Sequence, residues 1–145
     1  MSKRRGKQTV IFEKPPIIIA SAAIAGEKEA EGPLKDSFDC RLSDDSCGEP
    51  SWERSEAAIF HHSVMYALKK AGLAPEDIDY IFGGDLINQC VSTHYALRNI
   101  EIPFLGLYGA CSTMIEGMSL AAMLIDGGAL RAFLQSTREM IDGQQ

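Results

Sequence analysis

Cys111 is the residue best suited to chemistry in this sequence, because it stands at a small-residue corner between two apolar segments. Residues 102–107 predict a buried strand and residues 114–125 predict a helix. The first N–H groups of a helix lack partners within it, and the helix dipole favours negative charge there. This position predicts that Cys111 is a nucleophile, or part of an anion site with the N–H groups of Ser112 and Thr113. The alternative is that Cys111 is a small buried residue in a tight turn.

The helix that follows Cys111 has apolar residues on every face. Between residues 114 and 125 its only charged residue is Glu116, in the first turn, where it favours the helix dipole. A helix without a polar side is normally buried inside a larger body, and this one is too short to span a bilayer. The sequence therefore predicts a central helix that is covered on all sides.

A second group of polar residues, Asp85, Asn88 and Gln89, follows a short apolar strand at residues 80–83. These side chains form either one wall of a binding site or caps for the next helix. The adjacent His61 and His62 point about 100° apart on a helix, so they cannot share one metal ion. We therefore expect one exposed and one half-buried histidine here, and a helix-surface histidine at position 94.

Composition excludes several classes of function. The chain has 145 residues, 46% of them hydrophobic and 23% charged, as in a soluble globular protein. The net charge of −6 argues against a nucleic-acid partner. The four cysteines show no C-x-x-C spacing, so we expect reduced thiols and no metal site. No apolar run is long enough for a transmembrane helix, and we expect any membrane association to be peripheral.

Strand and helix patterns alternate along the chain. This order predicts an α/β fold with a mainly parallel sheet and right-handed crossovers, with sites beyond the carboxyl ends of the strands. We expect a flexible basic tail at residues 1–8, a domain at 9–135 and a polar tail at 136–145. The expected strands are residues 9–12, 17–24 (buried on both faces), 80–83, 102–107 and 129–134; the expected helices are a long one from the Ser51 cap to about Ala71, a turn at 73–79, a segment within 84–99 and residues 114–125.

Several motifs together resemble a known family. Residues 109–113 (GACST), before a small-residue helix that ends in LIDGG at 124–128, resemble the thiolase-like superfamily. More narrowly, the chain resembles the stage V sporulation protein AD (SpoVAD) family from about residue 6 to residue 130. The motifs that carry this narrower resemblance are GKQT (6–9), GPL (32–34), SWE (51–53), GGDLINQ (83–89) and IPF (102–104).

The resemblance implies the N-terminal half of a thiolase-like fold, with βαβαβαβ order, a mixed sheet and a buried central helix. Cys111 matches the thiolase nucleophile position, whereas the other thiolase catalytic groups come from a C-terminal half that we expect to be missing. After Leu134 the chain departs from the family pattern, which predicts a truncated protein or a fragment.

For function, the resemblance implies binding of dipicolinic acid, with calcium, for uptake into a developing endospore. It places the protein peripherally at the spore inner membrane, otherwise in the cytoplasm, beside other proteins of the SpoVA operon, and it implies no cofactor. We expect binding without turnover at Cys111, Ser112, Thr113, Asp85 and Asn88, with a homodimer as one possible assembly. Two alternatives stay open: acyl transfer with Cys111 as nucleophile, and an inert, aggregation-prone fragment.

Overall fold

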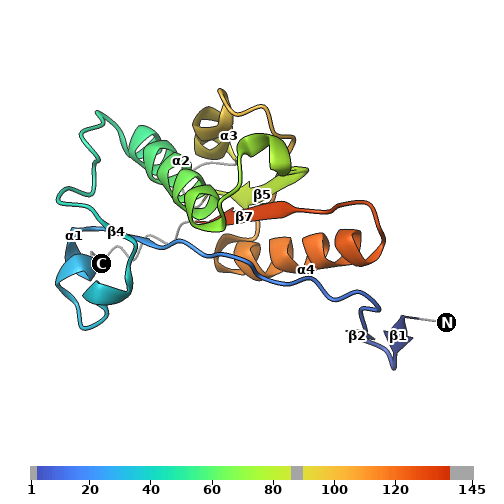
Figure 1. The fold of residues 1–145 in the computed structure, drawn as a ribbon. Helices are drawn as coiled ribbons and strands as arrows, with labels where there is room; N and C mark the ends of the chain where they lie inside the picture. The colour runs from blue at the N-terminus through green and yellow to red at the C-terminus, as the bar shows by residue number, and fades with distance from the viewer. Residues whose placement is uncertain (1–2, 86–89, 138–145) are drawn as a thin grey trace.

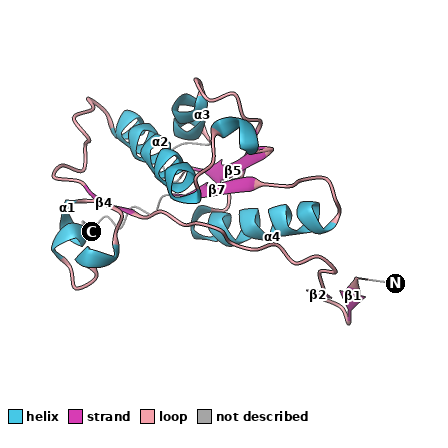
Figure 2. Cartoon of the chain, in the orientation of Figure 1, coloured by secondary structure: helices cyan, strands magenta, loops and turns pink. Residues whose placement is uncertain are grey.

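The core of the fold is a three-stranded parallel sheet in the order β6-β5-β7. The computed structural model describes residues 3–85 and 90–137, so the candidate Asn88 lies outside the described residues. In the central strand, Ile81 is opposite Phe104 of β6 and Leu134 of β7. The sheet confirms the predicted mainly parallel α/β fold (Figures 1 and 2). Its strands are β5 (Tyr80–Gly84), β6 (Phe104–Gly106) and β7 (Phe133–Thr137).

One face of the sheet is covered by α2 (Trp52–Ala71) and α3 (Val91–Leu97) (Figure 1). The Ser51 hydroxyl accepts a hydrogen bond from the Arg54 N–H at 3.4 Å, and Gly72 ends α2 in the left-handed conformation, as predicted. Together with the sheet the two helices bury the larger apolar cluster of the described chain. Its buried members are Phe60, Val64, Leu68, Ile78, Ile81, Ala96, Leu97, Ile102 and Leu134.

The other face is covered by α4 (Thr113–Asp126) (Figure 1). The cluster here is small, with Phe82, Ala121 and Leu130 as its buried members. The outer face of α4 is exposed, although it is apolar: Met114 is 44%, Ile115 58%, Leu120 40% and Met123 47% exposed. In the described chain the sheet covers only one side of α4, and the cover that its sequence predicts for the other sides is not present.

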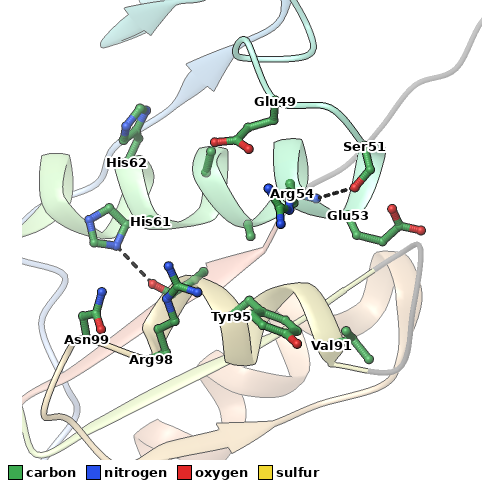
Figure 3. A pocket seen from close by; sticks show the side chains of 13 residues that line it. Glu49, Ser51, Glu53, Arg54, His61, His62, Val91, Tyr95, Arg98 and Asn99 are labelled. Atoms are coloured by element: carbon green, nitrogen blue, oxygen red, sulfur yellow. Dashed lines mark hydrogen bonds between the residues drawn. The ribbon is translucent and has the colours of Figure 1, made fainter.

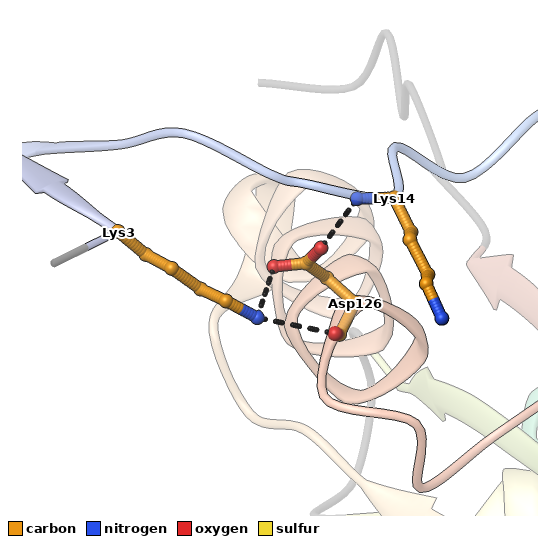
Figure 4. Close-up of polar contacts among 3 residues, drawn as sticks. All are labelled: Lys3, Lys14 and Asp126. Carbon is orange, nitrogen blue, oxygen red and sulfur yellow. Dashed lines mark hydrogen bonds and ion pairs between the residues drawn. The ribbon is translucent and has the colours of Figure 1, made fainter. Parts of the chain in front are cut away.

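The N-terminal segment is paired rather than unstructured. Strand β1 (Arg4–Arg5) forms an antiparallel pair with β2 (Thr9–Val10). Lys3 Nζ lies 2.8 Å from Asp126 Oδ2, and the N–H of Lys14 donates to Asp126 Oδ1 at 2.7 Å (Figure 4). The hydrogen bond from Lys3 holds the pKa of Asp126 below its ordinary value. The segment is therefore fastened to the end of α4.

The predicted buried strand at residues 17–24 is wrong. Ile17, Ile18 and Ile19 are 84%, 71% and 68% exposed, and they pair with no strand in the described chain. Only β3 (Ile24–Ala25) finds a partner, the parallel strand β4 (Cys40–Arg41), in a separate small sheet beside α1 (Glu27–Glu31). The apolar sequence favours a strand, but its burial requires a neighbour that this packing does not supply.

The boundaries of two other strands differ from the prediction. Strand β6 begins only at Phe104 and has an exposed edge, with Leu105 43% exposed. Strand β7 begins later than predicted and continues to Thr137, so the expected polar tail begins inside a strand. A short turn of 3₁₀ helix at Pro75–Asp77 lies where a capped turn was predicted. Across the described residues, no helix has both the length and the apolar character needed to cross a membrane.

Candidate functional site

Cys111 lies, as predicted, on a tight turn between a strand and a helix. After β6 the chain enters a 3₁₀ turn at Ala110–Ser112, and α4 begins at Thr113. Ala110 has φ 48°, in the left-handed region that residues with side chains rarely adopt. A Cβ on Gly109 would lie 2.5 Å from Ser112 Oγ and 2.6 Å from Glu116 Oε2, so these two side chains would have to move to admit a larger residue there. The result is a strained turn that exposes Cys111.

The N–H groups expected to bind an anion are already occupied. The Ser112 N–H donates to the Gly109 carbonyl at 3.0 Å, and the Thr113 N–H donates to the Ala110 carbonyl. The Thr113 hydroxyl accepts from the Gly109 N–H at 3.2 Å, and this residue is only 1% exposed. Ser112 and Thr113 therefore hold the turn together, which corrects the predicted role of their N–H groups.

The unoccupied amides of the turn lie one step earlier. The N–H groups of Ala110 and Cys111 donate to no residue in the described part of the chain. They are the first amides of the 3₁₀ turn, which have no partner within it for the same reason as at the start of any helix. Two adjacent N–H groups and an exposed thiol are therefore available to an anionic ligand.

The end of β5 packs directly against this turn. A Cβ on Gly84 would lie 2.0 Å from the Leu107 carbonyl oxygen and 3.2 Å from Thr113 Cγ2. The Leu107 N–H also donates to the Gly83 carbonyl at 2.7 Å. The carboxyl ends of β5 and β6 thus meet beneath Cys111, at the edge of the sheet where parallel α/β folds place their sites.

Asp85 is a helix cap rather than a wall of an open site. It is 2% exposed and accepts hydrogen bonds from the N–H of Thr93, at 2.9 Å, and from the Thr93 hydroxyl. Its Oδ2 atom has no hydrogen-bond partner among the described residues. Burial, and then the nearby carboxylate of Glu56, raise the pKa of Asp85 to about 6. Of the two roles expected for Asp85, the structure shows capping.

Two residues beside Asp85 were missed by the sequence analysis. Glu56 is 2% exposed on the inner face of α2. Its place four residues before Phe60 puts it on the apolar stripe, and this spacing could have revealed it. Trp52, four residues before Glu56, is 57% exposed.

Cys90 is the N-cap residue before α3, with φ 59°, and donates from its thiol to the Leu107 carbonyl at 3.5 Å. Burial, followed by the charge of Asp85, raises the pKa of this thiol. No sequence pattern located Cys90, because its position depends on how α3 packs against the end of β6.

The histidines make no hydrogen bond with Cys111 within ranges 3–85 and 90–137, and two of them bond to backbone carbonyls. His61 is half-buried, with Nδ1 3.1 Å from the Ala96 carbonyl oxygen, and His62 is exposed, as predicted. The exposed His94 bonds through Nδ1 to the Cys90 carbonyl, and its ring meets Phe104 edge to face at 5.0 Å. None of these contacts reaches Cys111. Among the described residues there is also no group of three or more side chains that could hold a metal ion.

The arrangement of strands, turn and helix defines the class of protein. A solved structure of 3-oxoacyl-(acyl carrier protein) synthase III, FabH, from Xanthomonas oryzae pv. oryzae matches 86% of this chain with a TM-score of 0.53. The match covers 44% of that enzyme at 18% sequence identity, so it establishes the fold alone. The chain thus has part of a thiolase-like α/β fold, as the sequence predicted.

Sequence comparison narrows the class to one family. Residues 6–140 match the family model of stage V sporulation protein AD (SpoVAD). The stage V sporulation protein AD of Bacillus subtilis (strain 168) is 41% identical over 135 residues, which are 93% of this chain. The chain belongs to the SpoVAD family, and it spans 40% of the length of that relative. Family membership confirms the resemblance found in the sequence.

Proposed function

We propose that this chain binds dipicolinic acid, without turnover, as part of its role in sporulation. The observation that carries the proposal is the exposed turn at the carboxyl ends of β5 and β6, where the Ala110 and Cys111 N–H groups are unoccupied. A carboxylate of the ligand accepts hydrogen bonds from these two amides, as anions do at helix N-termini. The net charge of −6 does not prevent binding, because local dipoles set the potential at such a site.

The surroundings of Cys111 support binding rather than catalysis. A thiol nucleophile needs a base within hydrogen-bond reach, and the two histidines with hydrogen bonds in the described chain, His61 and His94, bond to the carbonyls of Ala96 and Cys90. In this proposal the ligand, with calcium, is delivered into the developing endospore. The protein works peripherally at the spore inner membrane with other proteins of the SpoVA operon, and a homodimer is one possible assembly.

Titration of the 145-residue chain with dipicolinate tests the proposal. We expect the amide resonances of Ala110 and Cys111 to shift in a saturable way, while pyridine, which lacks carboxylates, leaves them unchanged. Cys111→Ala keeps both N–H groups and should still bind. Gly109→Val brings a branched side chain against Ser112 Oγ and Glu116 Oε2 and should weaken binding. Unshifted amides at saturating dipicolinate, both here and in the full-length Bacillus subtilis relative, would refute the proposal.

Acyl transfer is the second candidate, favoured by the strained, exposed turn and by the fold shared with a 3-oxoacyl-(acyl carrier protein) synthase. Incubation with acyl-CoA followed by mass spectrometry distinguishes the two. An acyl adduct on Cys111 that is lost in Cys111→Ala supports acyl transfer, whereas its absence supports binding alone.

An inert, self-associating chain is the third candidate, because α4 exposes Ile115, Leu120 and Met123. Sedimentation velocity tests it directly. A compact monomer argues against this candidate, while concentration-dependent association that Leu120→Ser combined with Met123→Ser suppresses would support it.

A further inference from the structure

A hollow between α2 and α3 lies apart from the turn at residues 109–113, which we call the Cys111 turn. Its volume is about 650 Å³, within the range of small-ligand sites. The first turns of α2 form one wall and α3 forms the other (Figure 3). None of its lining residues belongs to the Cys111 turn, so its chemistry can be considered independently.

Two arginines, Arg54 and Arg98, are the cationic groups of the hollow, and their formal charge is balanced by Glu49 and Glu53 on the same lining. Arg54 comes from α2 and Arg98 from the end of α3, and Figure 3 shows both on the walls that face the space between the helices. Neither guanidinium forms an ion pair or a side-chain hydrogen bond with another residue in ranges 3–85 and 90–137. The chain has more acidic than basic residues, with a net charge of −6, yet these two arginines form no ion pair within the described ranges and are available to an anionic ligand. The N-terminus of α2, at Ser51, adds the positive end of a helix dipole.

The rest of the lining suits a flat apolar group. Tyr95 is 63% exposed on the wall of the hollow, and Ala57, Ala58 and Ala96 contribute small apolar surfaces. A carbonyl oxygen only accepts hydrogen bonds, so His61 must donate from Nδ1 to Ala96, which leaves its Nε2 available. An aromatic ring can stack on Tyr95 while its substituent faces the arginines.

Two acidic residues limit what can enter. Glu49 and Glu53 also line the hollow, near the start of α2, and Figure 3 shows the Glu53 carboxylate directed away from Arg98. An extended polyanion would meet these carboxylates, whereas a compact anion can contact the arginines alone. The lining therefore favours a small ligand with one anionic group.

We propose that this hollow binds a small-molecule phosphate monoester whose phosphate is attached to a flat ring. One bidentate arginine already satisfies the two oxygens of a carboxylate, whereas a phosphate has three oxygens and nearly two negative charges for two guanidinium groups. Arg54 and Arg98 hold the phosphate from the two helices, and Tyr95 supports the ring. The ligand thereby bridges α2 and α3.

Phenyl phosphate serves as the probe. Its binding is measured by isothermal titration calorimetry and by shifts of the NMR resonances of Tyr95 and Arg98. We expect saturable binding, weaker binding of inorganic phosphate and of benzoate, and none of benzyl alcohol. Arg54→Gln and Arg98→Gln should each lower the affinity for phenyl phosphate by about tenfold, which is the effect of losing one charge-assisted hydrogen-bonding group. Tyr95→Ala should lower the affinity for phenyl phosphate but not the affinity for inorganic phosphate. The control Arg131→Gln, whose side chain is 93% exposed on another part of the chain, should bind normally.

Several outcomes would overturn the proposal. If the arginine variants bind phenyl phosphate as tightly as the parent chain, with unchanged melting temperatures, the two guanidinium groups do not contact the phosphate. Binding of benzyl alcohol as strong as that of phenyl phosphate would show an unselective apolar hollow. Phenyl phosphate shifts confined to the Ala110 and Cys111 amides would assign the ligand to the turn instead. A failure of dipicolinate to bind leaves these results unaffected, because the two sites share no residue.

Discussion

The two faces of the sheet differ in how completely their helices are covered. On one face, α2 and α3 bury the larger apolar cluster, and their outer surface carries polar residues together with the exposed Trp52, Met65, Val91 and Tyr95. On the other face, α4 buries only small residues such as Ala121 and exposes Met114, Ile115, Leu120 and Met123. Helix α4 has the apolar sequence of a helix that is normally buried both on its sheet side and on its outer side.

This difference teaches that local sequence can encode a contact that the surrounding chain does not supply. The Bacillus subtilis relative is more than twice as long as the matched region, because that region makes up 40% of it. We expect the remaining part of such full-length proteins to cover the outer face of α4.

The largest predicted effect is at Gly84, where the two faces and the Cys111 turn meet. Gly84→Ala would place a Cβ 2.0 Å from the Leu107 carbonyl oxygen, so the backbone itself must move. We expect a loss of more than about 4 kcal/mol in the free energy of unfolding, measured by urea denaturation. The control Gly32→Ala, with a nearest contact of 3.3 Å, should change it by less than about 1 kcal/mol. Similar values for the two variants would show that the turn does not need this close approach.

A matched pair of isoleucines measures the difference between the faces directly. Ile81 is 0% exposed in the larger cluster, and Ile115 is 58% exposed on α4. Ile81→Ala should lower the free energy of unfolding by about 2–5 kcal/mol, and Ile115→Ala should change it by less than about 0.5 kcal/mol. If Ile115→Ala is as destabilising as Ile81→Ala, the outer face of α4 is covered in solution, and sedimentation would then identify self-association.

The buried Asp85 gives the α2–α3 face a distinctive pH dependence. Its pKa is raised to about 6 from 3.8, so the folded state binds the proton more tightly than the unfolded state. The stability from this group is present below about pH 4 and is lost as the pH rises to about 6, by about 1–3 kcal/mol. Asp85→Asn keeps an acceptor for the Thr93 N–H and should remove this loss.

The measurement for Asp85 is the free energy of unfolding of the parent chain and of Asp85→Asn, each determined by urea denaturation across a range of pH and compared at each pH. The lowered pKa values of Asp39, Asp79 and Asp126 make stability rise with pH in both proteins, so only the difference isolates Asp85. A difference that stays constant from pH 4 to pH 7 would mean that Asp85 is ionised throughout.

The smallest effect concerns the attachment of the N-terminal segment to the end of α4. Asp126→Asn removes the ion pair with Lys3, and we expect tryptic cleavage at Arg4 and Arg5 to become several-fold faster, because local opening controls cleavage. Asp36→Asn, which removes only an exposed pair with Arg41, is the control and should not change the rate. Equal rates in all three proteins would show that the hairpin is held by its own pairing.

The sequence by itself determined the elements whose cause is local. Ser51 and Gly72 fixed the ends of α2, the apolar run at 80–83 fixed β5, and the small residues around Cys111 fixed the turn before α4. The alternation of these elements determined the parallel α/β sheet, and the motifs determined the family.

Only the tertiary structure decided which groups are paired and which are covered. The Ser112 and Thr113 N–H groups are occupied because the chain enters α4 through a 3₁₀ turn, which leaves Ala110 and Cys111 as the donors. Ile17 is exposed because no described strand pairs with it, although its sequence favours a strand. Propensity and spacing act over a few residues, whereas burial and the proximity of the Glu56 and Asp85 carboxylates depend on segments that are distant along the chain.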